Sequence, residues 1–197
     1  MSAVLIYRTF RLFFKKTVSS LGACVVLFAL YSYFESGNTV EEYALPFILG
    51  ALYIFTRYFL GEKLNMLSVS ICGFCFSCVL LLRQNMIALW VIFCIAVLVR
   101  EWKNQKVILR FILQFFIGVL AAAVPFTLYL LLNNAFGAFI KQYILFNFHY
   151  SSVGLPQKID AVIVWLIQPY SVIVIVVSIL LLLIRYDKKQ LCIINLI

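Results

Sequence analysis

Two adjacent acids, Glu41 and Glu42, are the residues of this sequence best suited to acid–base or metal chemistry. They stand directly before an apolar run that starts at Tyr43 and has Pro46 within its first turn, where a helix tolerates proline. The helix dipole favours carboxylates at such a start, so one interpretation is an acidic cap. The other is a carboxylate that binds a metal ion or a substrate hydroxyl. The pair alone leaves both open.

Cations that could face a phosphate lie in two other polar segments. Arg83 begins the turn Arg83-Gln84-Asn85 between two apolar runs. There it either lies among lipid headgroups or faces a cavity and pairs with a phosphate, which guanidinium groups bind well. Lys141 lies in the long segment 133–158. Glu41 and Glu42 are therefore the candidate catalytic residues, Arg83 and Lys141 the candidate phosphate ligands, and Asn85 a candidate auxiliary residue.

The segment 133–158 has apolar side chains at helical spacing: Phe136, Phe139, Ile140, Tyr143 and Ile144. This spacing predicts an amphipathic helix in the outer membrane interface. Its aromatic side chains form either an interfacial belt or a surface that holds a lipid. His149, the sole histidine, is a second candidate auxiliary residue, although a single interfacial histidine is more often structural, and only distant carboxylates could join it in a metal site.

Cys72, Cys75 and Cys78 form a C-x-x-C-x-x-C run that invites comparison with zinc or iron–sulfur sites. The run lies deep in an apolar stretch, however, where small residues on one stripe allow helices to pack closely. We favour packing, and we interpret Gly118 and Ala122 in the same way. No metal site is predicted from these residues.

The elements that must position these side chains follow from composition. Of the 197 residues, 65% are hydrophobic and only 12% are charged, whereas soluble domains carry about 25% charged residues. This excludes a soluble enzyme, a disordered chain and a coiled coil. The sequence predicts an all-α fold, a single polytopic membrane domain over 1–197 with an outer interfacial loop at 133–158. Its six apolar runs predict spans at about 18–34, 43–60, 64–82, 86–99, 107–132 and 161–184.

The basic residues orient the bundle. Thirteen of the 16 Lys and Arg residues fall in segments on one side, and only Arg83, Lys141 and Lys158 fall on the other. By the positive-inside rule the first side is cytoplasmic, so residues 35–42 and 133–158 are predicted outside. The net charge of +9 is thus a topology signal, and a nucleic-acid partner is not needed to explain it. The apolar runs at both ends, 3–7 and 191–197, predict that the chain is a piece of a larger membrane protein or a truncated product.

Three stretches together resemble bacterial GT-C type glycosyltransferases: GNTVEEYALPFILGALYIFTRYF, GFCFSCVLLLRQNMIALWVIF and GVLAAAVPFTLYLLLNNAFGAFIKQYILFNFHYS. They are most similar to family 39, or dolichyl-phosphate-mannose-protein mannosyltransferase-like, proteins. The resemblance covers about residues 5–185 and implies sugar transfer from a polyprenyl-phosphate donor at the outer face of the bacterial cytoplasmic membrane. In that family an earlier outer loop carries the acid taken as catalytic base. This sequence does not contain that loop, so this chain alone is expected to be inactive, with Glu41 and Glu42 as a second acidic element.

Two functions remain from the residues. One is a fragment of such a glycosyltransferase. In it Glu41 or Glu42, as an auxiliary group, deprotonates or orients the acceptor hydroxyl or holds a divalent cation as cofactor, and Arg83 and Lys141 meet the leaving phosphate. The other is a non-catalytic membrane protein, such as a transporter segment or a polysaccharide-assembly accessory. Gln168 and Pro169 are the nearest feature to a transporter's broken helix. Polar groups gathered at the outer face favour the first.

Overall fold

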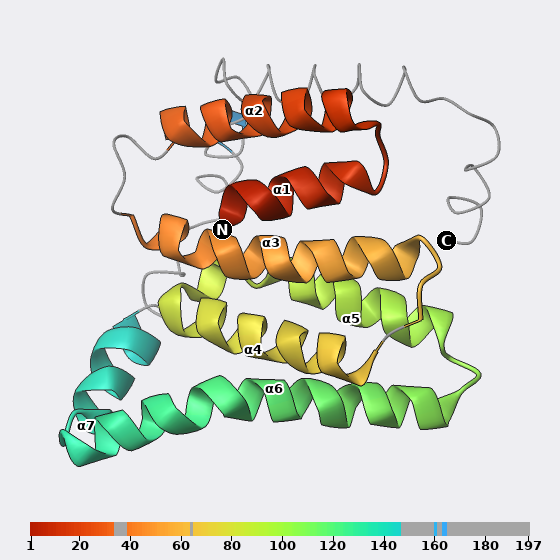
Figure 1. The fold of residues 1–197 in the computed structure, drawn as a ribbon. Helices are drawn as coiled ribbons and strands as arrows, with labels where there is room; N and C mark the ends of the chain where they lie inside the picture. Colours follow the sequence, from red (N-terminus) through yellow and green to blue (C-terminus); the bar gives the residue numbers. More distant parts are fainter. Residues whose placement is uncertain (34–38, 64, 147–159, 161–162, 165–197) are drawn as a thin grey trace. The chain divides into compact units, whose positions relative to one another are not determined.

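The computed structural model describes residues 1–33, 39–63, 65–146, 160 and 163–164. Across these residues every regular element is helical, which confirms the predicted all-α class (Figure 1). The elements are α1 (Ser2–Arg11), α2 (Lys16–Tyr33), α3 (Val40–Phe59), α4 (Met66–Leu82), the 3₁₀ turn η1 (Gln84–Met86), α5 (Ala88–Arg100), α6 (Gln105–Leu132), α7 (Phe136–Phe139) and the π-helix η2 (Ile140–Leu145).

Helices α2 to α6 match five of the predicted spans to within about three residues. The predicted sixth span, 161–184, lies almost wholly outside the described residues. One detail was wrong. Helix α3 begins at Val40 rather than Tyr43, so Pro46 lies in its second turn, inside the helix. The physical reason is that Thr39 is extended (φ −95°, ψ 154°) and its carbonyl already accepts a hydrogen bond from the Glu42 amide. Both acids therefore belong to the first turn.

The chain divides into two compact units, and the boundary falls between Ala123 and Val124 within α6. It lies beside Pro125, which has no amide hydrogen to donate to the carbonyl four residues earlier. In the first unit consecutive helices run back and forth: α1 packs on α2 and α3, and α3 packs along α4 (Figure 1). The amino end of α3 consequently lies beside the carboxyl end of α4.

Aromatic rings fill the main core of the first unit, between α3, α4, α5 and α6. Phe55 of α3 stacks on Phe93 of α5 with ring centroids 3.5 Å apart, and Phe111 of α6 meets Phe93 edge-on at 5.6 Å. Trp90 is 1% exposed, and its indole nitrogen donates a 3.0 Å hydrogen bond to the carbonyl of Cys72. A buried indole needs such a partner, so Trp90 fixes the register of α5 against α4.

Helices α4 and α6 approach each other closely at two glycines. A Cβ atom on Gly73 would overlap the Phe115 carbonyl, and one on Gly118 would overlap the Ser70 carbonyl. Ser70 also donates to the side-chain oxygen of Gln114 at 2.9 Å. This is the small-residue packing expected from the apolar stripe that contains the cysteine run.

The cysteine run takes part in the same core. Cys72 and Cys75 are buried there, and the Sγ atom of Cys75 lies 3.8 Å from the position of a Cβ on Gly50 in α3. In the described part of the chain no group of three or more His, Cys, Asp or Glu side chains is arranged to hold a metal ion.

The described part of the second unit is a short helical turn after α6. Phe139 of α7 packs edge-on against Phe126 at 5.5 Å and stacks on Tyr143 of η2 at 5.0 Å. Burial against these neighbours raises the pKa of the Tyr143 phenol. Lys141, two residues before Tyr143 on η2, is exposed. The predicted helix in segment 133–158 is thus present over 136–145.

Candidate functional site

Glu41 and Arg83, two of the predicted site residues, form an ion pair in the first unit through Glu41 Oε1 and Arg83 Nη1. Glu41 lies in the first turn of α3, and Arg83 is the extended residue (φ −157°, ψ 110°) that ends α4. The two residues are 42 positions apart in sequence, and the antiparallel packing of α3 on α4 brings them together. The guanidinium is 49% exposed and the carboxylate 21%.

Each charge of this pair also suits its own helix end. The negative Glu41 lies at the amino end of α3, where the helix dipole is positive, and the positive Arg83 lies at the carboxyl end of α4, where it is negative. The pair therefore neutralises a place where two opposed helix ends meet. An anion that displaced Glu41 would bind the Arg83 guanidinium. The released Glu41 carboxylate would then lie directly beside the bound anion.

The other predicted site residues are placed as follows. Glu42 shares the first turn of α3 with Glu41 and has interactions of its own. Asn85 is exposed in η1, two residues after Arg83. Lys141 belongs to the second unit. His149 lies outside the described residues, as do Gln168 and Pro169.

Thr39 was not singled out from the sequence, yet it lies two residues before Glu41. It precedes the first turn of α3 in the capping position, but its side chain makes no capping hydrogen bond. Its hydroxyl oxygen is buried and has no hydrogen-bond partner in the part of the chain that the structure describes. A threonine before two acids is a signal for a helix start, but the orientation of its hydroxyl cannot be deduced from the sequence.

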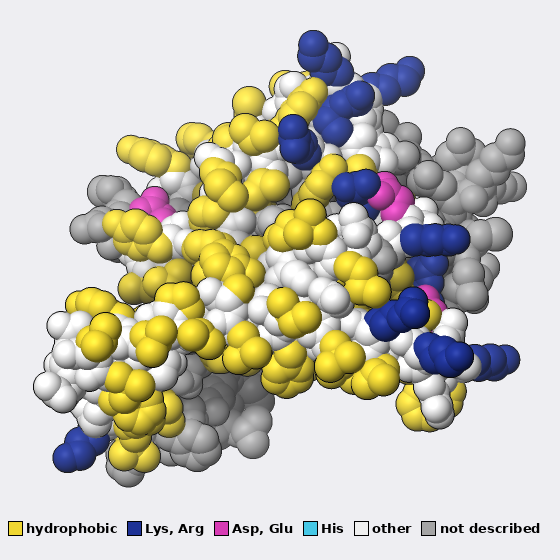
Figure 2. All heavy atoms as spheres, turned by 60° about the horizontal axis from the view of Figure 1, so that its bottom comes forward, with side chains coloured by type: hydrophobic (Ala, Val, Ile, Leu, Met, Phe, Trp, Pro, Cys, Tyr) yellow, Lys and Arg dark blue, Asp and Glu magenta, His cyan; other side chains and the backbone are white. Residues whose placement is uncertain are grey.

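The opposite end of the first unit is strongly basic. Figure 2 shows Lys and Arg side chains gathered at the end where α4 and α6 begin, while hydrophobic side chains cover the flanks of the helices. The basic residues in the turns and helix termini at this end are Arg8, Arg11, Lys15, Lys16, Arg57, Lys63, Arg100, Lys103, Lys106 and Arg110. Among the described residues of the first unit, Arg83 is the one Lys or Arg at the other end.

A polar cluster at the basic end joins α3 to α5. The Tyr58 hydroxyl donates to Glu101 at 3.3 Å, and Arg100 donates to the Tyr58 carbonyl at 2.9 Å. The Arg100 guanidinium also lies 4.5 Å from the centre of the Tyr58 ring. Sequence reasoning missed this cluster because its members are more than 40 residues apart. The adjacent charges of Arg100 and Glu101 after an apolar run were its only signal.

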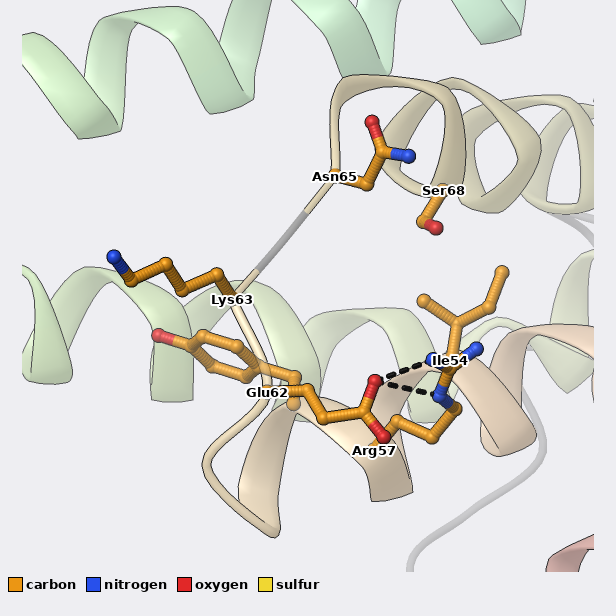
Figure 3. Close-up of a pocket in the computed structure, with 7 residues that line it drawn as sticks. Ile54, Arg57, Glu62, Lys63, Asn65 and Ser68 are labelled. Carbon is orange, nitrogen blue, oxygen red and sulfur yellow. Dashed lines mark hydrogen bonds and ion pairs between the residues drawn. The ribbon is translucent and has the colours of Figure 1, made fainter.

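A pocket of about 130 Å³ opens at the same end, between the carboxyl end of α3 and the amino end of α4 (Figure 3). Its lining comprises Ile54, Arg57, Tyr58, Glu62, Lys63, Asn65 and Ser68. The Arg57 Nε donates to Glu62 at 2.8 Å, and this hydrogen bond lowers the pKa of the Glu62 carboxyl below its usual value.

No protein-family model, curated protein or solved structure matches the chain.

Proposed function

We propose that the chain is a polytopic helical membrane bundle and that its Glu41–Arg83 end forms part of a GT-C-like glycosyltransferase site at the outer face. The transfer takes a sugar from a polyprenyl-phosphate donor. The observation that carries the proposal is the ion pair itself. It joins a carboxylate and a guanidinium from two helices at the end of the first unit opposite to the basic cluster.

Helix α6 gives the strongest support for membrane embedding. It has 28 residues and a mean hydropathy of 2.4 over its most apolar stretch, and it is the one described helix that is long and apolar enough to cross a membrane. At a rise of about 1.5 Å per residue it is about 42 Å long, against a hydrocarbon core of about 30 Å. Only 11% of that apolar stretch is buried inside the protein, whereas the core helix of a soluble protein is mostly buried.

The exposed side chains of the other helices support embedding as well. Large apolar side chains are exposed on α2, α4 and α5, for example Phe28, Leu67 and Ile92. Lys and Arg side chains are concentrated at one end of these helices. By the positive-inside rule that end is cytoplasmic, and the end with Glu41 and Arg83 faces outward.

The pair offers the two groups that sugar transfer from a phosphate donor requires. In the first step of the proposed reaction, the donor phosphate binds Arg83 and displaces Glu41. The freed Glu41 carboxylate accepts the proton of the acceptor hydroxyl while that oxygen bonds to the anomeric carbon. The bond between the anomeric carbon and the phosphate oxygen breaks, and polyprenyl phosphate leaves with the electron pair. Arg83 stabilises the negative charge that remains on it.

A non-catalytic membrane protein is the second candidate, and one observation favours it. Glu41 and Arg83 already neutralise each other and two helix ends, which is sufficient reason for a structural pair. The two candidates differ in what the pair must do chemically, so they can be separated by exchanging its members.

The deciding experiment is a charge swap, made in the complete enzyme of which this chain is proposed to form part. Glu41→Arg combined with Arg83→Glu keeps an ion pair in the same place but exchanges the proton acceptor and the phosphate ligand. Expression and thermal stability should return close to those of the unaltered protein, while sugar transfer from a polyprenyl-phosphate donor should stay abolished. If the swap restores transfer together with stability, the pair is structural and the catalytic proposal falls.

A further inference from the structure

We propose that the pocket at the basic end of the first unit binds the phosphate headgroup of an anionic membrane lipid. The proposal rests on the membrane embedding proposed above, but it requires no glycosyltransferase activity. It concerns the end of the helices opposite to Glu41 and Arg83, and thus a separate site.

The lining of the pocket provides the groups that bind a phosphate. Arg57 places a guanidinium beside the Glu62 carboxylate, and Lys63 also lines the pocket, with its side chain directed away from Arg57 in Figure 3. Ser68, in the first turn of α4, contributes a hydroxyl, which Figure 3 shows on the side of the pocket where Ile54 and Arg57 lie. Asn65 caps α4, with its Oδ1 accepting the Leu67 amide, and contributes its side-chain NH₂ group. The amino end of α4 adds amide hydrogens and the positive end of a helix dipole.

The existing contacts of Arg57, with Glu62 and with the Tyr53 ring, do not use up its capacity to bind an anion. Glu62 contacts Nε and Nη2 of Arg57, and a guanidinium has five N–H donors in all. Glu62 is also about half exposed and lies only five residues from Arg57 in sequence. It therefore acts as a local competitor that an incoming phosphate can displace into water.

The size of the pocket restricts the ligand. A volume of about 130 Å³ is close to that of engineered cavities that hold one benzene ring, and well below the ~300–1,000 Å³ of sites for drug-sized molecules. A phosphate group with a few water molecules fits, and the rest of a larger ligand would lie outside the pocket.

Apolar surface beside the pocket favours a lipid over free phosphate. Ile54 forms one wall. On α4, Leu67, Ile71 and Phe74 are 66%, 43% and 38% exposed, and their i, i+4, i+7 spacing places them on one stripe that leads away from the pocket. A lipid could place its phosphate in the polar pocket and bury an acyl chain against the apolar stripe of α4.

Lipid retention measured by native mass spectrometry tests the proposal. The protein is purified in detergent and mixed with dioleoyl phosphatidylglycerol or dioleoyl phosphatidylcholine. Phosphatidylglycerol should be retained preferentially, and the double variant Arg57→Gln, Lys63→Gln should lower its retention roughly tenfold. Lys103→Gln with Lys106→Gln is the matched control, because it removes the same charge at the same end but outside the pocket. An equal loss in the control would overturn the site in favour of diffuse attraction.

Two further arms make the result specific. Glu62→Gln should raise phosphatidylglycerol retention, because it removes the competitor and one negative charge; unchanged or lower retention would contradict the proposed competition. Dihexanoyl phosphatidylglycerol, which has short chains, should bind more weakly than the dioleoyl lipid. If inorganic phosphate competes as effectively as the lipid, the pocket is a free-phosphate site and the lipid assignment is wrong.

The same samples separate this proposal from the previous one. If alkaline carbonate releases the protein from membranes, the embedding fails and the proposed function fails with it. If the protein stays in the membrane and the pocket variants retain phosphatidylglycerol as well as the unaltered protein does, only the lipid site fails.

Discussion

The two ends of the first unit each carry an Arg–Glu ion pair, and the pairs differ in how they are built. Arg57 and Glu62 lie five residues apart, and both side chains are about half exposed. Glu41 and Arg83 come from different helices, and the carboxylate is mostly shielded. The Arg57–Glu62 pair needs only the local turn that ends α3. The Glu41–Arg83 pair forms only when α3 and α4 are packed against each other. A long-range pair of this kind reports on the fold and can hold two reactive groups at a fixed separation.

Neutralising the carboxylates of the two ion pairs, one at a time, should have the largest effect on sugar transfer, and the effect should differ most between the two ends. In the complete enzyme of which this chain is proposed to form part, Glu41→Gln keeps shape and hydrogen bonding but removes the proton acceptor, so sugar transfer should fall by a factor on the order of 10²–10⁴. Glu62→Gln, the matched change at the basic end, should leave transfer unchanged. The assay is initial-rate transfer from a polyprenyl-phosphate donor, normalised to the amount of protein in the membrane. Equal activity of the two variants would remove the functional difference between the ends.

Separation of α4 from α6 should damage both ends together. Gly118→Val would force a side chain into the Ser70 backbone and should lower the free energy of unfolding by about 1–3 kcal/mol or more. Gly137→Val is the control, since a Cβ atom there meets nothing within 4 Å. Thermal unfolding in detergent measures both. If Gly118→Val is as stable as Gly137→Val, the close helix contact is not needed for the fold.

The stability contributions of the two ion pairs should be smaller. A double-mutant cycle over Glu41→Gln and Arg83→Gln should give a coupling energy of up to about 1 kcal/mol, as is typical for partly exposed pairs. The corresponding cycle over Arg57 and Glu62 should give less, because both of its side chains are more exposed than Glu41. Chemical denaturation of the detergent-solubilised protein supplies the values. A larger coupling at the basic end would reverse the comparison.

The smallest expected effect is a pH dependence at the basic end. The Arg57 hydrogen bond lowers the pKa of Glu62 in the folded protein. The pair therefore contributes stability above the unfolded-state pKa of this carboxyl, near 4.5, and the contribution is lost as the pH falls through the lower folded-state value. The melting temperature of the unaltered protein should fall slightly more than that of Glu62→Gln over this range. Parallel curves would show that the pair contributes no pH-dependent stability.

The positions of the helices could be predicted from the sequence, and so could the end of the bundle that Glu41 and Arg83 share, because both follow from the spacing of the apolar runs. Apolar runs placed α2 to α6 closely, and the predicted orientation of the spans put Glu41 and Arg83 on the same side. The start of α3 was predicted three residues late because Glu41 and Glu42 interrupt the apolar pattern, although acids are favourable in a first helical turn.

Side-chain orientation accounts for what could not be predicted. The contact of Tyr58 with Arg100 and Glu101, and the pocket between Arg57 and Ser68, depend on which faces of α3, α4 and α5 turn toward one another. Hydropathy does not specify this for helices that are apolar on all sides.

The central claim is that the two ends of the first unit face opposite sides of a membrane, with the Glu41–Arg83 end outside. Cysteine labelling tests it most directly, with Val40→Cys and Lys103→Cys introduced into a Cys24→Ser background, since Cys24 is exposed. An impermeant maleimide applied to intact cells should label position 40, and it should label position 103 only after the membrane is permeabilised. Labelling of position 103 in intact cells, with none at position 40, would contradict the account.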